Sequence, residues 1–318
     1  MKLDPGHPIL RTENLTKRFG KRVVLDQLNL AIHRGEIFGY IGPNGAGKTT
    51  TFRILCGLLA PTEGRALIGE RDVARDRDEV KQLVGYLPDN FGIYPNLTVR
   101  EYLDFFAAAY KIPRRQRGQR VETCLRFAMA TDAGETLMGR LSRGMKQRVG
   151  IAKTLLHDPQ VLILDEPLAV IDPLARVQMR KLLRDLADLG KAVLVSSHIL
   201  PELADVCDTI GILNHGKLIA GGPVQEILRA VRQKRLIEIH VLKFAAQARQ
   251  VLAAAPGHWQ ALPPSAAPGQ GNVLRFEAEA DETQLAQALL LLLKRGIPVV
   301  SFAEVPADLE DLFVDLTR

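Results

Sequence analysis

One glycine-rich stretch, Gly42-Pro-Asn-Gly-Ala-Gly-Lys-Thr-Thr50, constrains this chain more than any other feature. It fits the pattern Gly-x-x-x-x-Gly-Lys-Thr at every fixed position. The apolar run Ile37–Ile41 before it predicts a buried strand, and residues 50–56 after it predict a helix. In that setting the backbone N–H groups of the loop converge on phosphate oxygens, and the helix directs its positive N-terminal end at them. The alternative, a glycine-rich turn beside a chance lysine, is disfavoured by the strand–loop–helix order.

The residue types of this loop suit a nucleoside phosphate with a bound cation. Lys48 is expected to reach the β- and γ-phosphates, and the hydroxyl of Thr49 is expected to ligate Mg²⁺. The predicted nucleotide-binding residues of the loop are Gly42, Pro43, Asn44, Gly45, Ala46, Gly47, Lys48, Thr49 and Thr50.

Length and composition limit the other possibilities. With 318 residues the chain exceeds what one core usually serves, which predicts two domains. The three cysteines are far apart in sequence and suit a reducing compartment. Because no apolar run approaches the ~20 residues of a membrane span and no signal peptide is recognisable, we expect a soluble, cytoplasmic chain. The net charge of +6 permits contact with nucleic acid or an anionic membrane, but a mild excess is more often a solvated surface.

Polar side chains follow three further predicted strands, at residues 83–87, 161–164 and 191–195. Ligands bind at the carboxyl ends of strands in open α/β sheets, which makes Asp89 a candidate. Asp165 and Glu166 follow four apolar residues, where two carboxylates are costly without partners such as Mg²⁺ and water. A lone histidine is most often a satisfied surface or core group, but His198 lies at a strand tip among other tips and is a better candidate.

Residues 96–160 differ in pattern and predict a helical region. Thr98 and Glu101 fit a capping box. Ser142 predicts the N-cap of a later helix, whose first N–H groups are open to an anion. The basic stretch from Pro113 to Arg120 indicates a solvated linker or helix face first, and a membrane-surface contact second.

An aromatic residue, Phe19, precedes the first predicted turn of the chain. Its ring could stack on a purine base. Taken alone, the residue is better explained as a core phenylalanine at the end of a hairpin.

The order of these motifs resembles that of the ATP-binding subunit of an ABC transporter. The likeness covers roughly residues 9–225 and rests on the phosphate-binding loop together with Leu141-Ser-Arg-Gly144, Leu164-Asp-Glu-Pro167 and Ser196-Ser-His198. Among such subunits it is most similar to exporter ATPases whose permease is a separate membrane protein. The segments with that character are Tyr86–Gly92, Leu141–Arg148 and Asp308–Thr317.

The resemblance implies an α/β fold of the P-loop NTPase, ABC-type ATPase class. Such a domain has a mixed-sheet core, a helical subdomain at about residues 90–160 and an N-terminal antiparallel β-subdomain. The predicted domains are then residues 9–225 and a small accessory α+β domain at residues 226–318, in which we find no catalytic set. In the second domain, Leu289–Leu293 covers every side of a predicted helix, so burial is expected, and the proline-rich residues 256–271 predict a flexible loop.

The resemblance also assigns roles within one chain. Phe19 matches the aromatic residue that stacks on adenine. Asp165 matches the carboxylate that holds Mg²⁺ through water, and Glu166 matches the general base that polarises the attacking water. His198 matches the residue that touches the γ-phosphate. Asp89 stands where the family usually has a glutamine that links Mg²⁺ and the attacking water to the permease contact.

Further roles involve a second chain. Ser142 and Gly144 match the signature motif that binds the γ-phosphate of the opposite subunit. The resemblance therefore implies ATP and Mg²⁺ as cofactors, a homodimer or heterodimer of ATPase subunits, and a separate integral-membrane permease. The expected location is peripheral, on the cytoplasmic face of the cell membrane, without direct nucleic-acid contact.

The sequence departs from the family's motifs at three places. Asp89 replaces glutamine, Arg143 replaces the central glycine of the signature, and Leu168–Ile171 replaces the usual small residues before Asp172.

Two alternative functions have less support. A soluble ABC ATPase acting on nucleic acid or the ribosome is supported only by the basic charge, since the sequence lacks an aromatic–basic stripe for bases. A regulator that binds ATP without hydrolysing it would lack Glu166 or His198, and both are present.

Overall fold

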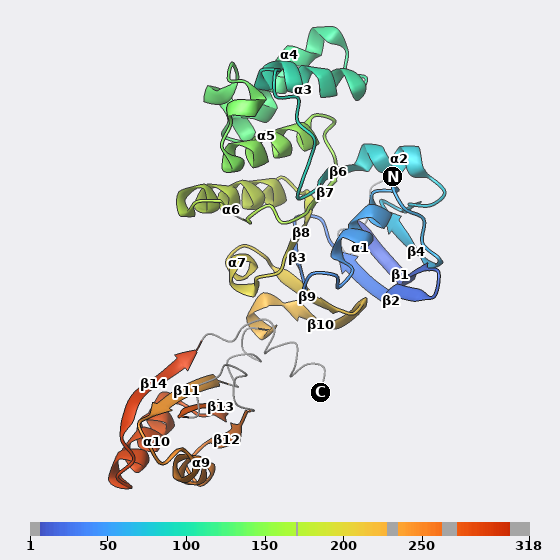
Figure 1. Cartoon of the computed structure of the whole chain (residues 1–318). Helices are drawn as coiled ribbons and strands as arrows, with labels where there is room; N and C mark the ends of the chain where they lie inside the picture. Colours follow the sequence, from blue (N-terminus) through green and yellow to red (C-terminus); the bar gives the residue numbers. More distant parts are fainter. Residues whose placement is uncertain (1–6, 170, 228–234, 263–271, 306–318) are drawn as a thin grey trace. The chain divides into compact units, whose positions relative to one another are not determined.

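The computed structural model describes residues 7–169, 171–227, 235–262 and 272–305 (Figure 1). The chain divides into two compact units, Met1–Val224 and Gln225–Arg318. Three segments considered above lie wholly or partly outside the described residues: Leu168–Ile171 at Val170, the proline-rich loop from Pro263 onward, and the terminal segment Asp308–Thr317.

Four antiparallel strands form the first sheet of the first unit. Strands β1 (Leu10–Phe19) and β2 (Arg22–Ile32) pair with each other, and a turn with Gly20 at φ 57° joins them. Strand β4 (Glu63–Ile68) pairs with the other edge of β1, and β5 (Arg71–Asp72) follows it in the sheet. The expected N-terminal antiparallel part is confirmed.

A six-stranded mixed sheet forms the core of this unit. In spatial order its strands are β10 (Lys217–Pro223), β9 (Thr209–Asn214), β3 (Ile37–Ile41), β8 (Ala192–Ser197), β7 (Val161–Leu164) and β6 (Val84–Leu87). All but β10 run parallel, and β10 pairs antiparallel with β9. Every residue of β3, β7 and β8 is buried, as expected for parallel strands covered on both faces. The carboxyl ends of β3, β8, β7 and β6 therefore lie next to one another at one edge.

Helices cover this sheet. Helix α1 (Lys48–Leu55) follows the glycine-rich loop. Helix α6 (Pro173–Asp188) is capped by Asp172, whose side chain accepts a 2.8 Å hydrogen bond from the N–H of Ala175. Helix α7 (Leu200–Ala204) is short. Helix α2 (Arg77–Leu83) follows β5 and leads into β6.

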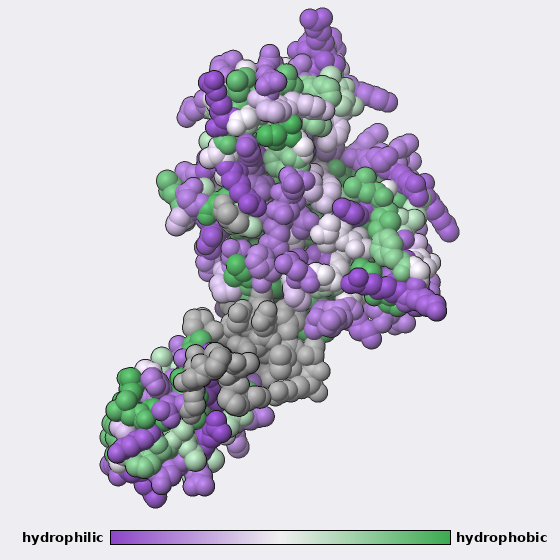
Figure 2. All heavy atoms as spheres, viewed as in Figure 1, coloured by the Kyte–Doolittle hydropathy of each residue, from purple (hydrophilic) through white to green (hydrophobic). Residues whose placement is uncertain are grey.

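A group of helices lies at one end of the unit, at the top of Figure 1. It contains α3 (Val99–Ala109), α4 (Arg114–Phe127) and α5 (Arg143–Leu155), with short 3₁₀ helices at Thr131–Ala133 and Met138–Arg140. The predicted helical region and the Thr98 capping box are both confirmed. On the face shown in Figure 2, hydrophilic residues cover most of this unit and hydrophobic residues form scattered patches.

Two arginines in the basic stretch from Pro113 to Arg120 donate hydrogen bonds to backbone carbonyls. Arg120 donates hydrogen bonds to the carbonyls of Leu155 and Leu156 (2.7 Å each), and Arg117 donates to the carbonyl of Ile112. The two bonds of Arg120 tie α4 to the end of α5. The stretch is therefore a helix face and not a linker.

The second unit has a four-stranded antiparallel sheet with the order β12-β13-β11-β14. The strands are β11 (Arg235–Val241), β12 (His258–Ala261), β13 (Val273–Glu279) and β14 (Val299–Val305), and the helices are α9 (Ala245–Ala253) and α10 (Glu282–Lys294). The expected α+β composition is confirmed.

Two expectations for this unit are wrong. Strand β12 lies inside the stretch predicted to be a flexible loop, because four residues there pair with β13. In α10, Leu292 is fully buried, but Leu290 and Leu293 are 53% and 52% exposed. A helix that packs on one side of a sheet buries only one stripe of its surface, so the leucine run cannot be buried all round.

Candidate active site

The glycine-rich loop connects β3 to α1 and requires glycine at specific positions. Gly47 has φ 117°, and a Cβ there would lie 2.7 Å from the side chain of Leu25. A Cβ at Gly42 would lie 2.5 Å from the carbonyl oxygen of Leu213. The loop is thus held tightly against neighbouring strands, with its backbone turned toward the edge of the sheet where the other strands end.

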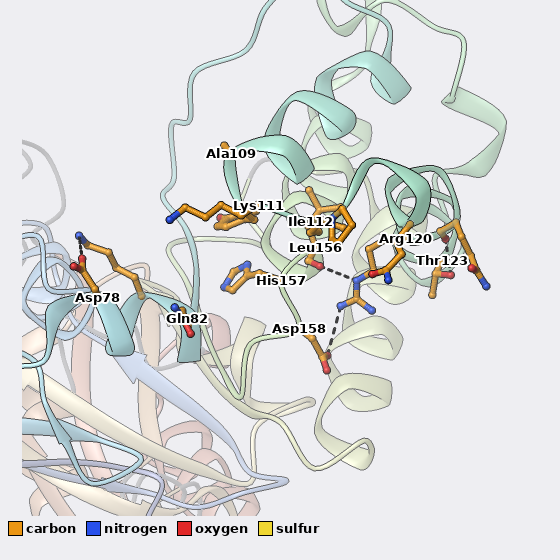
Figure 3. A pocket seen from close by; sticks show the side chains of 15 residues that line it. Asp78, Gln82, Ala109, Lys111, Ile112, Arg120, Thr123, Leu156, His157 and Asp158 are labelled. Carbon is orange, nitrogen blue, oxygen red and sulfur yellow. Dashed lines mark hydrogen bonds and ion pairs between the residues drawn. The ribbon is translucent and has the colours of Figure 1, made fainter.

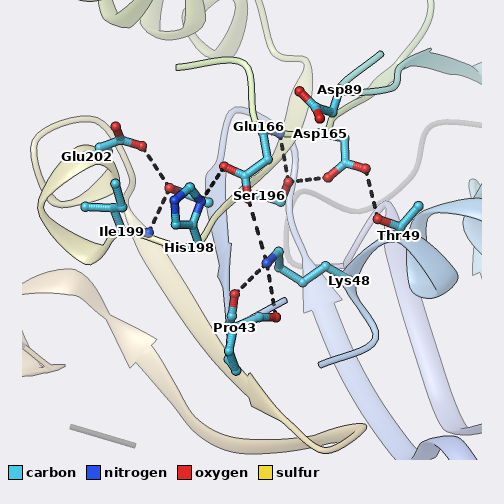
Figure 4. Close-up of polar contacts among 12 residues, drawn as sticks. Pro43, Lys48, Thr49, Asp89, Asp165, Glu166, Ser196, His198, Ile199 and Glu202 are labelled. Carbon is cyan, nitrogen blue, oxygen red and sulfur yellow. Dashed lines mark hydrogen bonds and ion pairs between the residues drawn. The ribbon is translucent and has the colours of Figure 1, made fainter. Parts of the chain in front are cut away.

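Lys48 lies at the start of α1 and is only 7% exposed. Its ammonium group donates hydrogen bonds to the carbonyls of Gly42 and Pro43, and Nζ lies 3.7 Å from Oε1 of Glu166 (Figure 4). Burial lowers the pKa of Lys48, while the negative charges of Glu166 and Asp165 oppose that shift. The ammonium group is therefore held by the carbonyls of the loop itself, close to the carboxylate of Glu166.

Asp165 follows β7 and is 5% exposed. Its Oδ1 accepts a 2.6 Å hydrogen bond from the hydroxyl of Ser196, and its Oδ2 accepts a 3.2 Å hydrogen bond from the hydroxyl of Thr49 (Figure 4). The two bonds hold this buried carboxylate between β8 and α1.

The same group of oxygen atoms fits Mg²⁺. The carboxylate of Asp165 and the hydroxyl of Thr49 meet at one point, and both are oxygen ligands of the kind that Mg²⁺ prefers. Within the described ranges, no group of three or more His, Cys, Asp and Glu side chains is arranged to hold a metal ion. Mg²⁺ bound to a nucleotide usually takes one or two protein ligands beside phosphate and water oxygens, so these two residues suffice.

Glu166 has an unusual backbone conformation. Its φ is 50°, in the left-handed region that costs a side-chain-bearing residue free energy and often occurs at functional sites. The N–H of Glu166 donates a 2.9 Å hydrogen bond to the hydroxyl of Ser196. Its Oε2 lies 3.1 Å from Nδ1 of His198, which is about half exposed at the tip of β8 (Figure 4). The carboxylate is therefore held between Lys48 and His198.

Ser196 is a site residue that the sequence interpretation did not select. It is 1% exposed and contacts both acidic residues through its hydroxyl. The signal was present, because β7 and β8 are parallel neighbours in which Leu164 pairs with Val195. The next residue on each strand, Asp165 and Ser196, must then adjoin.

A pocket of about 390 Å³ lies between these residues and the end of the first sheet. Its lining is Phe19, Arg22, Val24, Asn44, Gly45, Gly47, Lys48, Thr49, Thr50, Asp89, Asp165 and Glu166. Phe19 is 50% exposed at the end of its hairpin, with the ammonium group of Lys17 5.0 Å from the ring centroid. The core-phenylalanine alternative is therefore wrong. Arg22 and Val24 were not selected from the sequence, although they follow directly on that hairpin turn.

Two further predicted residues, Ser142 and Gly144, lie elsewhere. Ser142 caps α5, and its side chain accepts a 3.2 Å hydrogen bond from the N–H of Met145. Neither Ser142 nor Gly144 is among the described residues that line the pocket of about 390 Å³, which we call the nucleotide-sized pocket. Asp89 does line it, but its carboxylate contacts Arg143 at 3.5 Å.

A larger cavity of about 1080 Å³ lies between α2 and the α3–α4 hairpin (Figure 3). His157 lines it, stacks on Tyr110 with ring centroids 4.2 Å apart, and approaches the carbonyl of Val84 at 3.0 Å. Burial lowers the pKa of His157. This cavity contains none of the predicted site residues, so its size does not make it the active site.

The comparisons with known proteins agree with the arrangement of motifs. The family model described as "ABC transporter" matches residues 25–169. Over 305 residues the chain is 34% identical to the Nod factor export ATP-binding protein I of Burkholderia orbicola, covering 96% of this chain and 95% of that protein. The chain belongs to the family of ABC transporter ATP-binding subunits.

Other relatives in this family match about seven tenths of the chain. The chain is 38% identical over 223 residues to the probable multidrug ABC transporter ATP-binding protein YbhF of Escherichia coli, covering 70% of this chain and 38% of that protein. It is 36% identical to the bacitracin transport ATP-binding protein BcrA of Bacillus licheniformis, covering 73% and 75%. The chain thus spans less than two fifths of the length of the first of these relatives.

Solved structures of the family confirm the predicted fold class. A structure described as the ATP binding subunit of an ABC transporter has 30% identity and a TM-score of 0.63, covering 70% of this chain and 93% of that one. The structure of cbiO1 from Clostridium perfringens, described as part of the ABC transporter complex cbiONQ, has 28% identity and a TM-score of 0.65, covering 79% and 96%. In the described part of the chain, no helix is both long and apolar enough to span a membrane.

Proposed function

We propose that this ABC family member is the ATP-binding and ATP-hydrolysing subunit that powers an exporter. The observation that carries the proposal is the meeting of Lys48, Asp165, Glu166 and His198 at the ends of neighbouring parallel strands. The relatives include ATP-binding proteins of a probable multidrug ABC transporter, of bacitracin transport and of Nod factor export, and they do not favour the nucleic-acid alternative.

The proposed reaction is attack of water on the γ-phosphate of ATP. Glu166 is the residue to polarise the water, because Lys48 and His198 contact its carboxylate and the hydroxyl of Ser196 accepts a hydrogen bond from its backbone N–H. Lys48 and the N–H groups of the loop stabilise the charge on the phosphates. Thr49 and Asp165 would hold Mg²⁺, with Asp89 facing the same pocket, and the metal supplies neutralisation of phosphate charge. Phe19 would stack on the adenine.

A second ATPase subunit would complete the site. Ser142 and Gly144 lie at the exposed start of α5 and do not line the pocket of their own chain, in the part that the structure describes. Helix N-termini bind anions, so this end of α5 fits the γ-phosphate of a partner's ATP. We propose that ATP joins two such subunits, identical or related, and that hydrolysis separates them.

The loop after β6 offers a path from the nucleotide to a membrane permease. It begins near Asp89 and reaches Tyr94, whose ring packs edge-on against Phe105 with centroids 5.4 Å apart. The two rings are 48% and 50% exposed, which leaves apolar surface for a cytoplasmic loop of the permease. We propose that the chain is peripheral on the cytoplasmic face of the membrane, docked through this surface.

Replacement of Glu166 by glutamine tests the hydrolytic role. E166Q keeps the size of the side chain and removes the base, so turnover should fall by at least about a hundredfold, in the range for loss of a general base. ATP and Mg²⁺ should then retain the chain as a dimer in size-exclusion chromatography. Turnover that stays at the wild-type rate would refute the role of Glu166.

Isolation of the full chain from detergent-solubilised membranes tests the transport role. We expect an integral-membrane permease to accompany it, and the double variant Y94A/F105A to lose that partner while it keeps ATP binding. Recovery of ribosomes or DNA in place of a permease would contradict the proposal. We further propose that residues 9–225 and 226–318 are separate domains, which predicts that the second folds when produced alone.

A further inference from the structure

Two departures from the usual family motifs lie against each other in this chain. Asp89, in the place of the usual glutamine, lies with Oδ1 3.5 Å from Nη2 of Arg143, which replaces the central glycine of the signature. The two side chains are 52% and 50% exposed. We propose that Arg143 is a positioning residue that holds Asp89 in the nucleotide-free chain, and that Mg²⁺–ATP competes with Arg143 for this carboxylate. The inference rests on the proposed function as an ATPase.

The position of Arg143 explains why it needs a negative partner. It is the first residue of α5, where the helix dipole is positive and a second positive charge is unfavourable. The first turn of α5, which lies wholly within the described residues, contains no acidic side chain. Asp89 comes from the loop after β6 and offsets the charge from outside the helix.

Asp89 lines two adjacent cavities. One is the nucleotide-sized pocket, and the other, of about 520 Å³, is lined by Asp89, Asn90, Phe91, Ile93, Arg143, Lys146 and Gln147. The other two carboxylates of the first pocket have partners inside the site, since Asp165 accepts from Ser196 and Glu166 contacts Lys48. Of the three carboxylates among the described lining residues, Asp89 is the one whose charge partner, Arg143, lines the second cavity. The Asp89 carboxylate therefore lies between Arg143 on one side and the nucleotide pocket on the other.

A second contact keeps the loop on α5 without the ion pair. The ammonium group of Lys153 lies 5.0 Å from the ring centroid of Phe91 and 5.1 Å from that of Phe106. A Cβ at Gly150 would lie 2.9 Å from the Phe91 ring, so the glycine lets this ring lie directly on the helix. Loss of Arg143 should therefore free the Asp89 carboxylate while the loop remains in place.

Calorimetric titration with AMP-PNP, a non-hydrolysable ATP analogue, tests the competition in the full chain. In R143Q, Asp89 is free for the metal, so the Mg²⁺ concentration that gives half-maximal nucleotide affinity should fall by about two- to fivefold, the size expected for a half-exposed ion pair. In EDTA the sign reverses. An unpaired Asp89 repels the triphosphate, so R143Q should bind AMP-PNP more weakly than the wild type.

K146Q is the matched control, because Lys146 lies on the same turn of α5 and has no ion-pair partner among the described residues. K146Q should shift the affinity for AMP-PNP in the same direction with Mg²⁺ and in EDTA. D89N/R143Q should behave as D89N. The inference is overturned if R143Q shifts affinity in the same direction with and without Mg²⁺, or if its Mg²⁺ effect persists in the D89N background. A wild-type chain that does not bind AMP-PNP would refute the proposed function and this inference with it.

Discussion

Ser196 links the two acidic residues of the site, and its replacement by alanine should have a large effect for so small a change. The variant removes the hydrogen bond to Asp165 Oδ1 and the acceptor of the Glu166 N–H, at a position that is 1% exposed. A hydrogen bond to a charged group contributes about 1.5–3 kcal/mol, and one from a backbone amide contributes about 1 kcal/mol. We therefore expect S196A to lose about 2.5–4 kcal/mol of unfolding free energy.

The chain contains a matched control one residue later. Ser197 is also 1% exposed, donates a 2.9 Å hydrogen bond to the buried carboxylate of Glu202 and accepts a 3.0 Å bond from the N–H of Ile199. S197A should lose a similar free energy of unfolding. Glu202 does not line the nucleotide pocket within the described residues, so S197A should keep the Mg²⁺ dependence of ATP turnover, whereas S196A should need more Mg²⁺ and turn over more slowly.

Urea unfolding followed by far-UV circular dichroism gives the free energies, since the single tryptophan, Trp259, belongs to the second unit and reports on that unit. The rate of ATP turnover, measured at a series of Mg²⁺ concentrations, gives the Mg²⁺ dependence of each variant. If S196A and S197A lost equal stability and kept equal Mg²⁺ dependence, the hydroxyl of Ser196 would serve packing only. The argument that it orients Asp165 and Glu166 would then be refuted.

Two further predictions concern other parts of the first unit. F19A should weaken ATP affinity by about fivefold or more, because stacking of a base on an aromatic ring contributes about 1–3 kcal/mol. Equilibrium binding of ATP measures this change, and F244A, which replaces a half-exposed aromatic residue of the second unit, is the control. Unchanged ATP affinity in F19A would contradict the stacking role. The hydrogen bond from the backbone N–H of Thr98 lowers the pKa of Glu101, so its stabilising effect is complete above the ordinary glutamate value of about 4.3 and is lost as pH falls through the lowered pKa. E101Q should flatten this acid branch of the stability curve in urea unfolding, and an unaltered branch would exclude Glu101 as its source.

The sequence predicted the site well where chemistry follows strand ends. Asp165 and Glu166 follow one short apolar run, and Ser196-Ser-His198 follows another. The parallel pairing of β7 with β8 places these two strand ends next to each other. The hydrogen-bonding role of Ser196 depends on the same pairing but was overlooked, because serine at a strand tip is common and carries no charge. Local patterns thus locate polar residues more readily than they identify which of them contact one another.

Features that depend on tertiary packing could not be predicted. The contact between Asp89 and Arg143 joins a loop to a distant helix, and no spacing in the sequence encodes it. The exposure of Leu290 and Leu293 likewise follows from how α10 packs on its sheet, since the composition of the helix would equally suit full burial. Strand β12 forms because β13 provides a partner, in a segment whose prolines indicated a loop.

The register between β7 and β8 has a further consequence for engineering. Successive residues of a strand face opposite sides, and Leu164 pairs with Val195 just before Asp165 and Ser196 meet. One residue inserted within β8 would turn Ser196 to the opposite face and separate it from Asp165, although every functional side chain would still be encoded. Insertions in the surface turns between helices would leave this alignment intact. The backbone pairing of these two buried strands therefore determines where a change of chain length is tolerated and where it disrupts the site.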